Sequence, residues 1–233
     1  MQQTSEPSQS RPMKFEILHP AWGALALILS VSACSGHHDS KQETTLSAFQ
    51  VCDSTLDSSA VASLQRMGAT EKFSELPGTD DVGHANKFSL RRAAGTLHDD
   101  ITKRNQCDVF KSGDKTGHSL IEVDFSASRD HPSVNSSSVQ GESENTLYPI
   151  GVYAKVHART SATLYFKCTT YGSTKTADST PYVRGYLYST PDQASPNTTG
   201  KDLMVILNSI SRSMAKQLGC ASQAALPSRV PST

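Results

Sequence analysis

The sequence predicts an α+β domain in which an antiparallel sheet of about five to six strands is packed by a C-terminal amphipathic helix and a shorter N-terminal helix. Two patterns indicate this fold class. Apolar and polar residues alternate through the middle of the chain, which is the period of strands that have one buried face. Towards the C-terminus apolar residues recur every three or four positions instead, which is the period of a helix face.

A short helix is predicted over residues 58–67, near the start of the domain. The Asp57 carboxylate can cap its first N–H groups, and Gly68 provides a stop. Residues 87–103 mix both periods and fit either a strand or a helix interrupted by Gly95. We favour a strand over 87–91 followed by a turn and a short helix.

Period-two alternation then marks five strands, at residues 107–112, 118–126, 147–158, 161–170 and 182–189. The first two are separated by a short turn and are predicted to form a hairpin. Residues 127–145 and 172–181 are expected to be surface loops, because they are rich in small polar residues.

The second strand of this hairpin has two different faces. Alternation places Ile121, Val123 and Phe125 on one face and Leu120, Glu122 and Asp124 on the other. Glu122 and Asp124 could act as a catalytic carboxylate pair. On an exposed sheet face, however, we expect them to form ion pairs with a cation on a neighbouring strand, such as Lys155 or Arg184.

The strongest helix signal lies near the C-terminus, followed by Gly219 as a C-cap and Cys220 just beyond it. Its apolar positions are Leu203, Ile206, Leu207, Ile210, Met214 and Leu218. We expect this helix to cover one face of the sheet and to close a single domain over residues 49–226. Residues 227–233 contain two prolines and are expected to fray.

The N-terminus has the pattern of an export signal. Arg11 and Lys14 precede an apolar run over residues 21–31, which is too short to span a bilayer but suits a secretory signal. Met13 offers a second start that would give a signal of ordinary length.

The run ends in Val31-Ser32-Ala33-Cys34, which resembles the bacterial lipobox. The resemblance implies that residues 1–33 are a lipoprotein signal peptide and that the Cys34 thiol acquires a diacylglycerol. A further acyl chain of the palmitate type on the new amino group would make the anchor firm, because each buried CH₂ contributes about 0.8 kcal/mol. We expect a protein anchored on the extracytoplasmic face of the cell membrane.

Residues 34–48 are small, polar and aperiodic, and are predicted to form a flexible tether. His37, His38 and Asp39 invite a metal interpretation, but a flexible tether gives them no framework for coordination geometry. We therefore expect neither a metal site nor any other cofactor.

The chain has five cysteines, and lipidation of Cys34 would leave four. Outside the cytoplasm four widely spaced cysteines favour two disulfides, which can be connected in three ways. We favour Cys52 with Cys107 and Cys168 with Cys220, because each pair joins a residue that flanks a helix to a strand.

The whole mature region resembles small actinobacterial lipoproteins that have no assigned activity, and four segments carry the resemblance. They are VCDSTLD at 51–57, RRAAGTLHDDITKRNQC at 91–107, YPIGVYA at 148–154 and AKQLGC at 215–220. That family supplies no catalytic residues to carry over.

Charge and motifs exclude several function classes. The 22 basic and 22 acidic residues balance, so the basic surplus that nucleic-acid binding draws on is missing. S-x-x-K at 213–216 and K-T-G at 115–117 stand in the reverse of the order found in penicillin-recognising enzymes, and S-D-N is absent. We expect no catalytic residues and no enzymatic activity.

Tyrosines are the most suggestive candidates for a binding surface. Tyr182, Tyr186 and Tyr188 share one strand face with Arg184, and Tyr165 and Tyr171 share the outward face of another strand. If the two faces are adjacent and uncovered, they form an aromatic strip suited to a protein or small-molecule ligand. The alternative is that these side chains pack under a loop.

The sequence thus predicts a lipid-anchored, non-enzymatic binding or interaction module at the cell envelope. The alternative is a cell-envelope hydrolase whose site is assembled across loops, with His98, His131 or Glu122 beside a serine.

Overall fold

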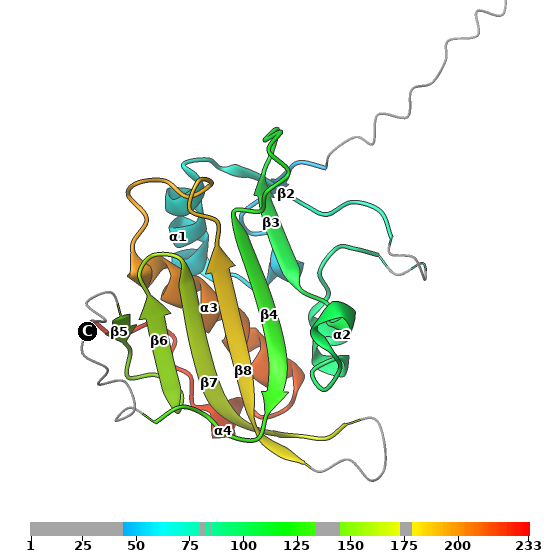
Figure 1. Cartoon of the computed structure of the whole chain (residues 1–233), viewed down its shortest axis with the longest axis vertical. Helices are drawn as coiled ribbons and strands as arrows, with labels where there is room; N and C mark the ends of the chain where they lie inside the picture. The colour runs from blue at the N-terminus through cyan, green and yellow to red at the C-terminus, as the bar shows by residue number, and fades with distance from the viewer. Residues whose placement is uncertain (1–43, 80–82, 84, 134–144, 173–178) are drawn as a thin grey trace, which may run out of the picture. The chain divides into compact units, whose positions relative to one another are not determined.

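The computed structural model describes residues 44–79, 83, 85–133, 145–172 and 179–233. The strands among them form one antiparallel sheet of eight strands. The predicted signal peptide, Cys34 and most of the tether lie outside these residues, as do 134–144 and 173–178 of the two expected loops. Figure 1 views the sheet from the face that carries no helix over its central strands.

The strand order is β1-β2-β3-β4-β8-β7-β6-β5, so two meanders meet where β4 pairs with β8. The strands are β1 (Leu46–Ser47), β2 (Lys72–Glu75), β3 (Cys107–Lys111), β4 (Ile121–Ser128), β5 (Asn145–Leu147), β6 (Tyr153–His157), β7 (Ser161–Thr170) and β8 (Thr180–Ser189). The β4–β8 junction runs from Ile121 opposite Ser189 to Ser128 opposite Tyr182.

The fold class agrees with the sequence prediction, but five to six strands is too low a count. β1, β2 and β5 are two, four and three residues long, which is too short for a period-two pattern to register. The strand predicted over 147–158 is divided into β5 and β6. Gly151, with φ +62°, lies in the turn between them, where a Cβ would come 2.3 Å from the Tyr165 carbonyl oxygen.

Two local predictions are wrong. The strand expected over 87–91 is replaced by helix α2 (Leu90–Gly95), because the Ser89 side chain caps the helix by accepting the Arg92 N–H. Leu120, expected on the outward face with Glu122, is fully buried, because it precedes the start of β4 and packs into the core.

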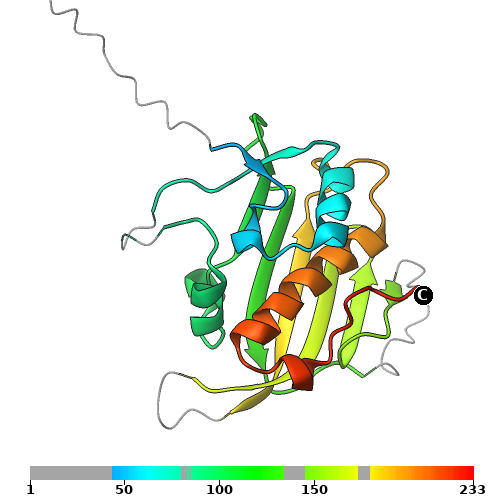
Figure 2. The ribbon, with the colours of Figure 1, turned by 180° about the vertical axis from the view of Figure 1, so that it is seen from behind.

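The other helices lie on the opposite face of the sheet, which is turned towards the viewer in Figure 2. They are α1 (Ser58–Gly68), α3 (Gly200–Gln217) and α4 (Ala221–Ala224), and short 3₁₀ turns occupy Cys52–Ser54 and Ile101–Lys103. As predicted, Asp57 caps α1 by accepting the Ser59 and Ala60 N–H groups. α3 crosses β6, β7 and β8 and packs against α1.

Helix α3 approaches the sheet closely because β8 has a glycine beneath it. A Cβ on Gly185 would lie 3.0 Å from Phe125 Cε1 and 3.1 Å from Leu207 Cδ1, which is tighter than ordinary packing. The apolar stripe predicted from the sequence faces this contact, and Leu203, Ile206, Leu207, Ile210 and Met214 are all fully buried.

Both ends of α3 are fixed. At its start the Thr199 hydroxyl accepts the Asp202 N–H, and the Asp202 carboxylate accepts the Thr199 N–H in return, which completes a capping box. At its end Gly219 has φ +73°, and the N–H groups of Gly219 and Cys220 bond to the carbonyls of Lys216 and Ala215. This is a Schellman motif, so the predicted glycine C-cap is confirmed.

Two disulfides tie helix-flanking residues to strands, with the connectivity that the sequence favoured. Cys52 bonds to Cys107 in β3, and Cys168 in β7 bonds to Cys220, which follows the Schellman turn. All four cysteines are buried, and each bridge should stabilise the fold by about 2–5 kcal/mol.

The fold extends beyond the predicted boundaries at both ends. At the N-terminal side Leu46 already pairs with Phe73 in the sheet, inside the segment expected to be tether. At the C-terminal side the expected frayed tail lies against α3: the Asn208 side chain donates to the Pro227 carbonyl at 2.9 Å, and Val230 is buried.

The close approach at Gly185 predicts that Gly185→Ala will lower the free energy of unfolding by about 1–3 kcal/mol, because the added methyl must displace Phe125 or Leu207. Chemical denaturation of the oxidised protein measures this. Gly95→Ala is the matched control, since a Cβ there meets open space and alanine favours a helix by up to about 1 kcal/mol. Equal effects at the two positions would contradict the packing role of Gly185.

Candidate functional site

The sheet face opposite α3 carries most of the predicted tyrosines. Along β8, Tyr182, Arg184, Tyr186 and Tyr188 are half-buried and alternate with buried residues that point towards α3. In the register of β7 with β8, Tyr165 stands opposite Arg184. The two strand faces are therefore adjacent, and no helix or strand among the described residues lies over them in Figure 1.

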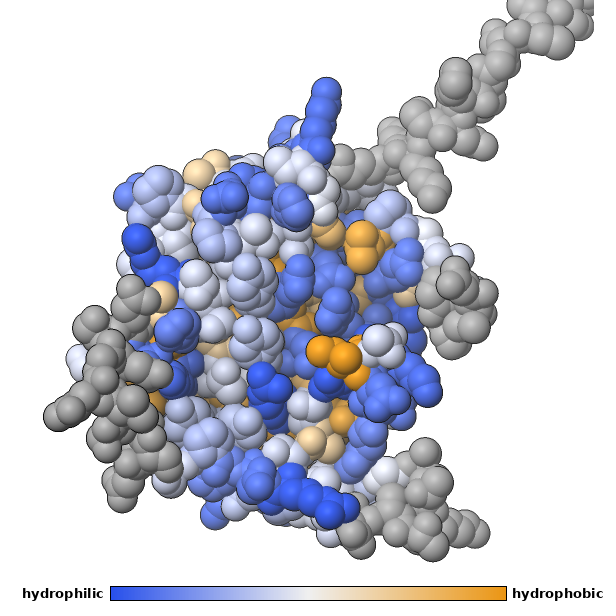
Figure 3. Space-filling model, viewed as in Figure 1, coloured by the Kyte–Doolittle hydropathy of each residue, from blue (hydrophilic) through white to orange (hydrophobic). Residues whose placement is uncertain are grey.

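This open face is polar as well as aromatic. Figure 3 shows it mainly in blue and pale colours, with hydrophobic orange limited to small patches. The Arg184 guanidinium lies 5.0 Å from the centroid of the Tyr186 ring, a cation–π contact that orients both side chains.

Tyr171 does not belong to this face. The pairing of β7 with β8 becomes irregular between Lys167 and Thr170, so Tyr171 lies beyond the end of the regular strand. Its side chain is 72% exposed and lines a separate hollow beside α2.

The tyrosine face includes two further aromatic rings that the sequence analysis did not predict. Tyr153 of β6 stands opposite Tyr165, with ring centroids 6.0 Å apart and an edge-to-face arrangement. His131 packs its ring 4.8 Å from that of Tyr182 and 6.5 Å from that of Tyr165. Alternation in the strand could have found Tyr153, but His131 follows the end of β4, where no periodic pattern places a side chain.

A hollow of about 280 Å³ lies where these rings meet β6 and β7. Cationic and hydroxyl side chains join the aromatic ones in its lining. It is lined by Pro132, Tyr153, Lys155, His157, Ser161, Thr163, Tyr165 and Arg184. Among these described lining residues there is no carboxylate.

Acidic residues of the same face lie on β3 and β4. Asp124 forms an ion pair with Arg104 at 3.1 Å, rather than with the expected Lys155 or Arg184. Burial raises the pKa of Asp124 above its usual value, although the charges of Arg104 and Arg184 oppose this shift.

Asp108 and Glu122 stand directly opposite each other across β3 and β4. Burial and the neighbouring charge of Glu122 raise the pKa of Asp108 to about 6. Glu122 is held in place by the Ser119 hydroxyl, which donates to it at 2.7 Å. These carboxylates belong to the framework of the sheet face, since they are half-buried or bonded to neighbours.

His98 and His131, the two histidines considered for a hydrolase, lie in different parts of the structure. His131 donates from Nδ1 to the Pro132 carbonyl, and its ring meets that of Tyr182 edge to face. His98 Nε2 lies 3.0 Å from the Thr170 hydroxyl, in the hollow of about 250 Å³ beside α2. Thr170 is in turn bonded to the Thr180 hydroxyl at 2.8 Å.

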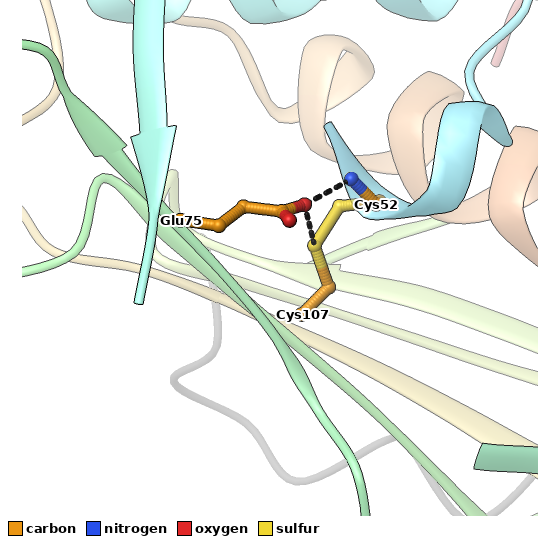
Figure 4. Close-up of side chains that lie close together, drawn as sticks. All are labelled: Cys52, Glu75 and Cys107. Atoms are coloured by element: carbon orange, nitrogen blue, oxygen red, sulfur yellow. Dashed lines mark hydrogen bonds between the residues drawn. A yellow bond between two sulfur atoms is a disulfide. The ribbon is translucent and has the colours of Figure 1, made fainter. Parts of the chain in front are cut away.

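Glu75 lies against the Cys52–Cys107 disulfide (Figure 4). Its Oε1 accepts the Cys52 N–H at 2.5 Å and lies 3.8 Å from Cys107 Sγ. Burial raises the pKa of Glu75, against the lowering effect of the Cys52 N–H. Disulfide sulfurs carry no thiolate charge, so the trio caps a turn and offers no metal-binding set while the bridge is formed.

A hollow of about 560 Å³ lies on the helix side, between α1, α3 and the C-terminal tail. Its buried Asp202 is paired with Arg66 at 2.5 Å, and its Asp57 is paired with Arg212 at 3.1 Å. Burial would raise the pKa of Asp202, but Arg66 and Thr199 together hold it below its usual value. These ion pairs join α1 to α3 and so serve the fold.

A scan of family models and searches of curated proteins and of solved structures find no match to this chain. Within the described residues, no helix combines the length and the apolar character needed to cross a bilayer.

The Asp108–Glu122 contact predicts a pH-dependent stability. Because the folded state raises the pKa of Asp108 to about 6, stability is lost as pH rises through that value, where the carboxyl must ionise in the sheet. Asp108→Asn should therefore stabilise the protein at pH 7.5 by about 1 kcal/mol, after allowing for solvent screening, and have little effect near pH 3.5.

Urea denaturation at the two pH values measures this difference. Asp192→Asn removes a charge from an exposed loop and serves as the control, with the same stability change expected at both pH values. A gain from Asp108→Asn that does not grow with pH would contradict the electrostatic explanation.

Proposed function

We propose that this chain is a lipid-anchored extracytoplasmic protein of the cell envelope and that its domain is a non-enzymatic binding module. The lipobox at Val31 to Cys34 supports the anchor. Two buried disulfides fit an oxidising compartment, because cytoplasmic thiols are kept reduced. The anchor would hold the domain at the outer surface of the membrane, within reach of envelope components.

The observation that carries the binding role is the open tyrosine face of β6, β7 and β8. Tyr165, Tyr182, Tyr186 and Tyr188 present aromatic surface without full burial. Tyrosine is enriched in binding surfaces because it offers a large rigid ring and a hydroxyl at little cost in entropy. One face of the sheet is covered by α3, and no described helix or strand lies over the central strands of the other face, which provides a rigid platform for such contacts.

A hydrolase is the second candidate, because His98 and Thr170 form a hydrogen-bonded base and hydroxyl beside a hollow. Such a pair also needs a group that orients the imidazole and donors for an oxyanion. The hydrogen bonds of the described residues supply neither around His98. Ester turnover abolished by Thr170→Val in a protein of unchanged stability would favour this candidate.

The binding role predicts the effect of two substitutions on the tyrosine face. Tyr165→Ala and Tyr186→Ala should each weaken retention of the detergent-solubilised full chain on isolated bacterial envelopes by about tenfold or more. Tyr171→Ala is the matched control, because this exposed tyrosine lies off the face and should leave retention unchanged. Thermal melting of each variant separates binding from folding: parallel losses of both would indicate that the tyrosines serve packing.

The anchor is tested separately. Mass spectrometry of the membrane fraction should find an N-terminal Cys34 that carries a diacylglycerol and an amide-linked acyl chain. Cys34→Ser should release the protein from the membrane without changing its melting temperature. An unmodified Cys34 in the exported protein would contradict the lipoprotein assignment.

A further inference from the structure

Glu75 and the two cysteines of the first disulfide reach one point from three separate segments of the chain. Cys52 lies in the 3₁₀ turn after β1, Glu75 ends β2 and Cys107 begins β3. One ligand atom of each side chain lies within 4.8 Å of the other two. Thiolate sulfur and carboxylate oxygen are both zinc ligands in proteins, so the three side chains have the chemistry of a metal site once the cysteines are reduced.

The spacing of these atoms already fits one edge of such a site. Two ligands of a tetrahedral zinc ion, with bonds of about 2.0–2.3 Å, lie about 3.5–3.8 Å from each other. Glu75 Oε1 lies 3.8 Å from Cys107 Sγ, which matches this separation. A disulfide holds its two sulfurs much closer together than two zinc ligands, so the cysteines must separate after reduction.

The chain at Cys52 can make that movement. Cys52, Asp53 and Ser54 have φ of +51°, +57° and +56°, which are three consecutive left-handed residues without a glycine. This conformation is unfavourable for L-amino acids and persists only where the surrounding structure imposes it. With the covalent bond removed the turn has one constraint fewer, whereas Cys107 is held in β3 opposite Val123.

Glu75 has a buried oxygen that the fold does not use. Its Oε1 accepts the Cys52 N–H, whereas Oε2 is buried and has no hydrogen-bond partner among the described residues. A buried acceptor without a partner costs free energy, and a cation held beside it would offset that cost. The second bridge provides a comparison, because no carboxylate or histidine of the described residues joins Cys168 and Cys220 in such a group.

We propose that the dithiol form of this protein binds Zn²⁺ through Cys52, Cys107 and Glu75, a role separate from that of the tyrosine face. A dithiol reductant first exchanges with the bridge: its two thiols become one disulfide, and their two electrons and two protons leave Cys52 and Cys107 as thiols. Zn²⁺ then displaces both thiol protons to solvent and bonds to the two thiolates and the Glu75 carboxylate. Water fills the fourth position, as in other zinc sites with three protein ligands. The bridge and the bound metal therefore exclude each other.

The test is a metal titration of the detergent-solubilised full chain, reduced with dithiothreitol and freed of excess reagent by anaerobic desalting. Co²⁺ is the probe, because it accepts the same ligands as Zn²⁺ and its bonds to thiolate absorb light. We expect about one ion per chain, bleaching of the cobalt–thiolate spectrum by Zn²⁺, and release of about two protons per ion. The oxidised protein should give none of these signals.

Cysteine variants locate the thiolates. Cys52→Ser/Cys107→Ser should abolish the cobalt–thiolate spectrum of the reduced protein. Cys168→Ser/Cys220→Ser is the matched control, because it removes the other bridge and leaves the proposed ligands in place, so the spectrum should remain.

Glutamate variants test the third ligand. Glu75→Gln should weaken the Zn²⁺ affinity of the reduced protein by about tenfold or more, measured by competition with a chromogenic chelator. Glu71→Gln is the matched control, since this exposed carboxylate lies just before the other end of β2, and the affinity should change less than about twofold.

Folding is followed in the same samples. A site that exists only in the folded state stabilises that state when it is occupied. Zn²⁺ should therefore raise the melting temperature of the reduced protein, or restore its far-ultraviolet circular dichroism if reduction has unfolded it. This effect should be absent in Cys52→Ser/Cys107→Ser and smaller in Glu75→Gln.

Three results would overturn the proposal. They are a reduced protein without a cobalt–thiolate spectrum, a spectrum that survives Cys52→Ser/Cys107→Ser, and a Zn²⁺ affinity that Glu75→Gln leaves unchanged. Envelope retention by the tyrosine face is measured on the oxidised protein, so the metal site and the binding role fail separately.

Discussion

The seating of α3 on the sheet is the contact on which the rest of the structure depends. Gly185 lets the helix lie close to β8, the capping box at Thr199 and Asp202 sets its start, and the Cys168–Cys220 bridge holds its end to β7. With one face of the sheet filled in this way, the alternation of β7 and β8 turns every second side chain outward. The tyrosine platform is therefore a geometric consequence of where the helix sits.

Long periodic elements could be predicted from the sequence, and short ones could not. β7 and β8 are long enough for their alternation to predict their bounds closely, and the periodicity of α3 predicts its buried face and its C-cap. β1 and β5 have only two and three residues and depend on neighbours for their hydrogen bonds. Residues 87–103 fit both a strand and a helix, and the favoured strand over 87–91 is wrong because the Ser89 side chain caps α2 there, which a periodic pattern does not reveal. A local pattern predicts the structure of such a segment only when the segment is long enough for its periodicity to outweigh a single side-chain contact.

The candidate site was predictable to the same extent. Alternation identified the outward residues of β8 and the partner Tyr165, because it needs only one strand at a time. It could not supply His131 or the pairing of Asp124 with Arg104, since these depend on which segments lie side by side after folding. As a result the described face has two parts. Its carboxylates on β3 and β4 belong to the framework of the sheet, and its half-buried tyrosines lie on β7 and β8.

The sheet ends in very short strands on both sides, β1 with two residues and β5 with three. A long bare edge is a template on which another chain can extend the sheet, and this is how cross-β polymers begin. Lipid anchors would bring many copies of this domain into one plane, where such edge-to-edge association would be most frequent. Short edges leave little backbone for a neighbour to copy, so a dense layer of these domains can remain a set of separate molecules.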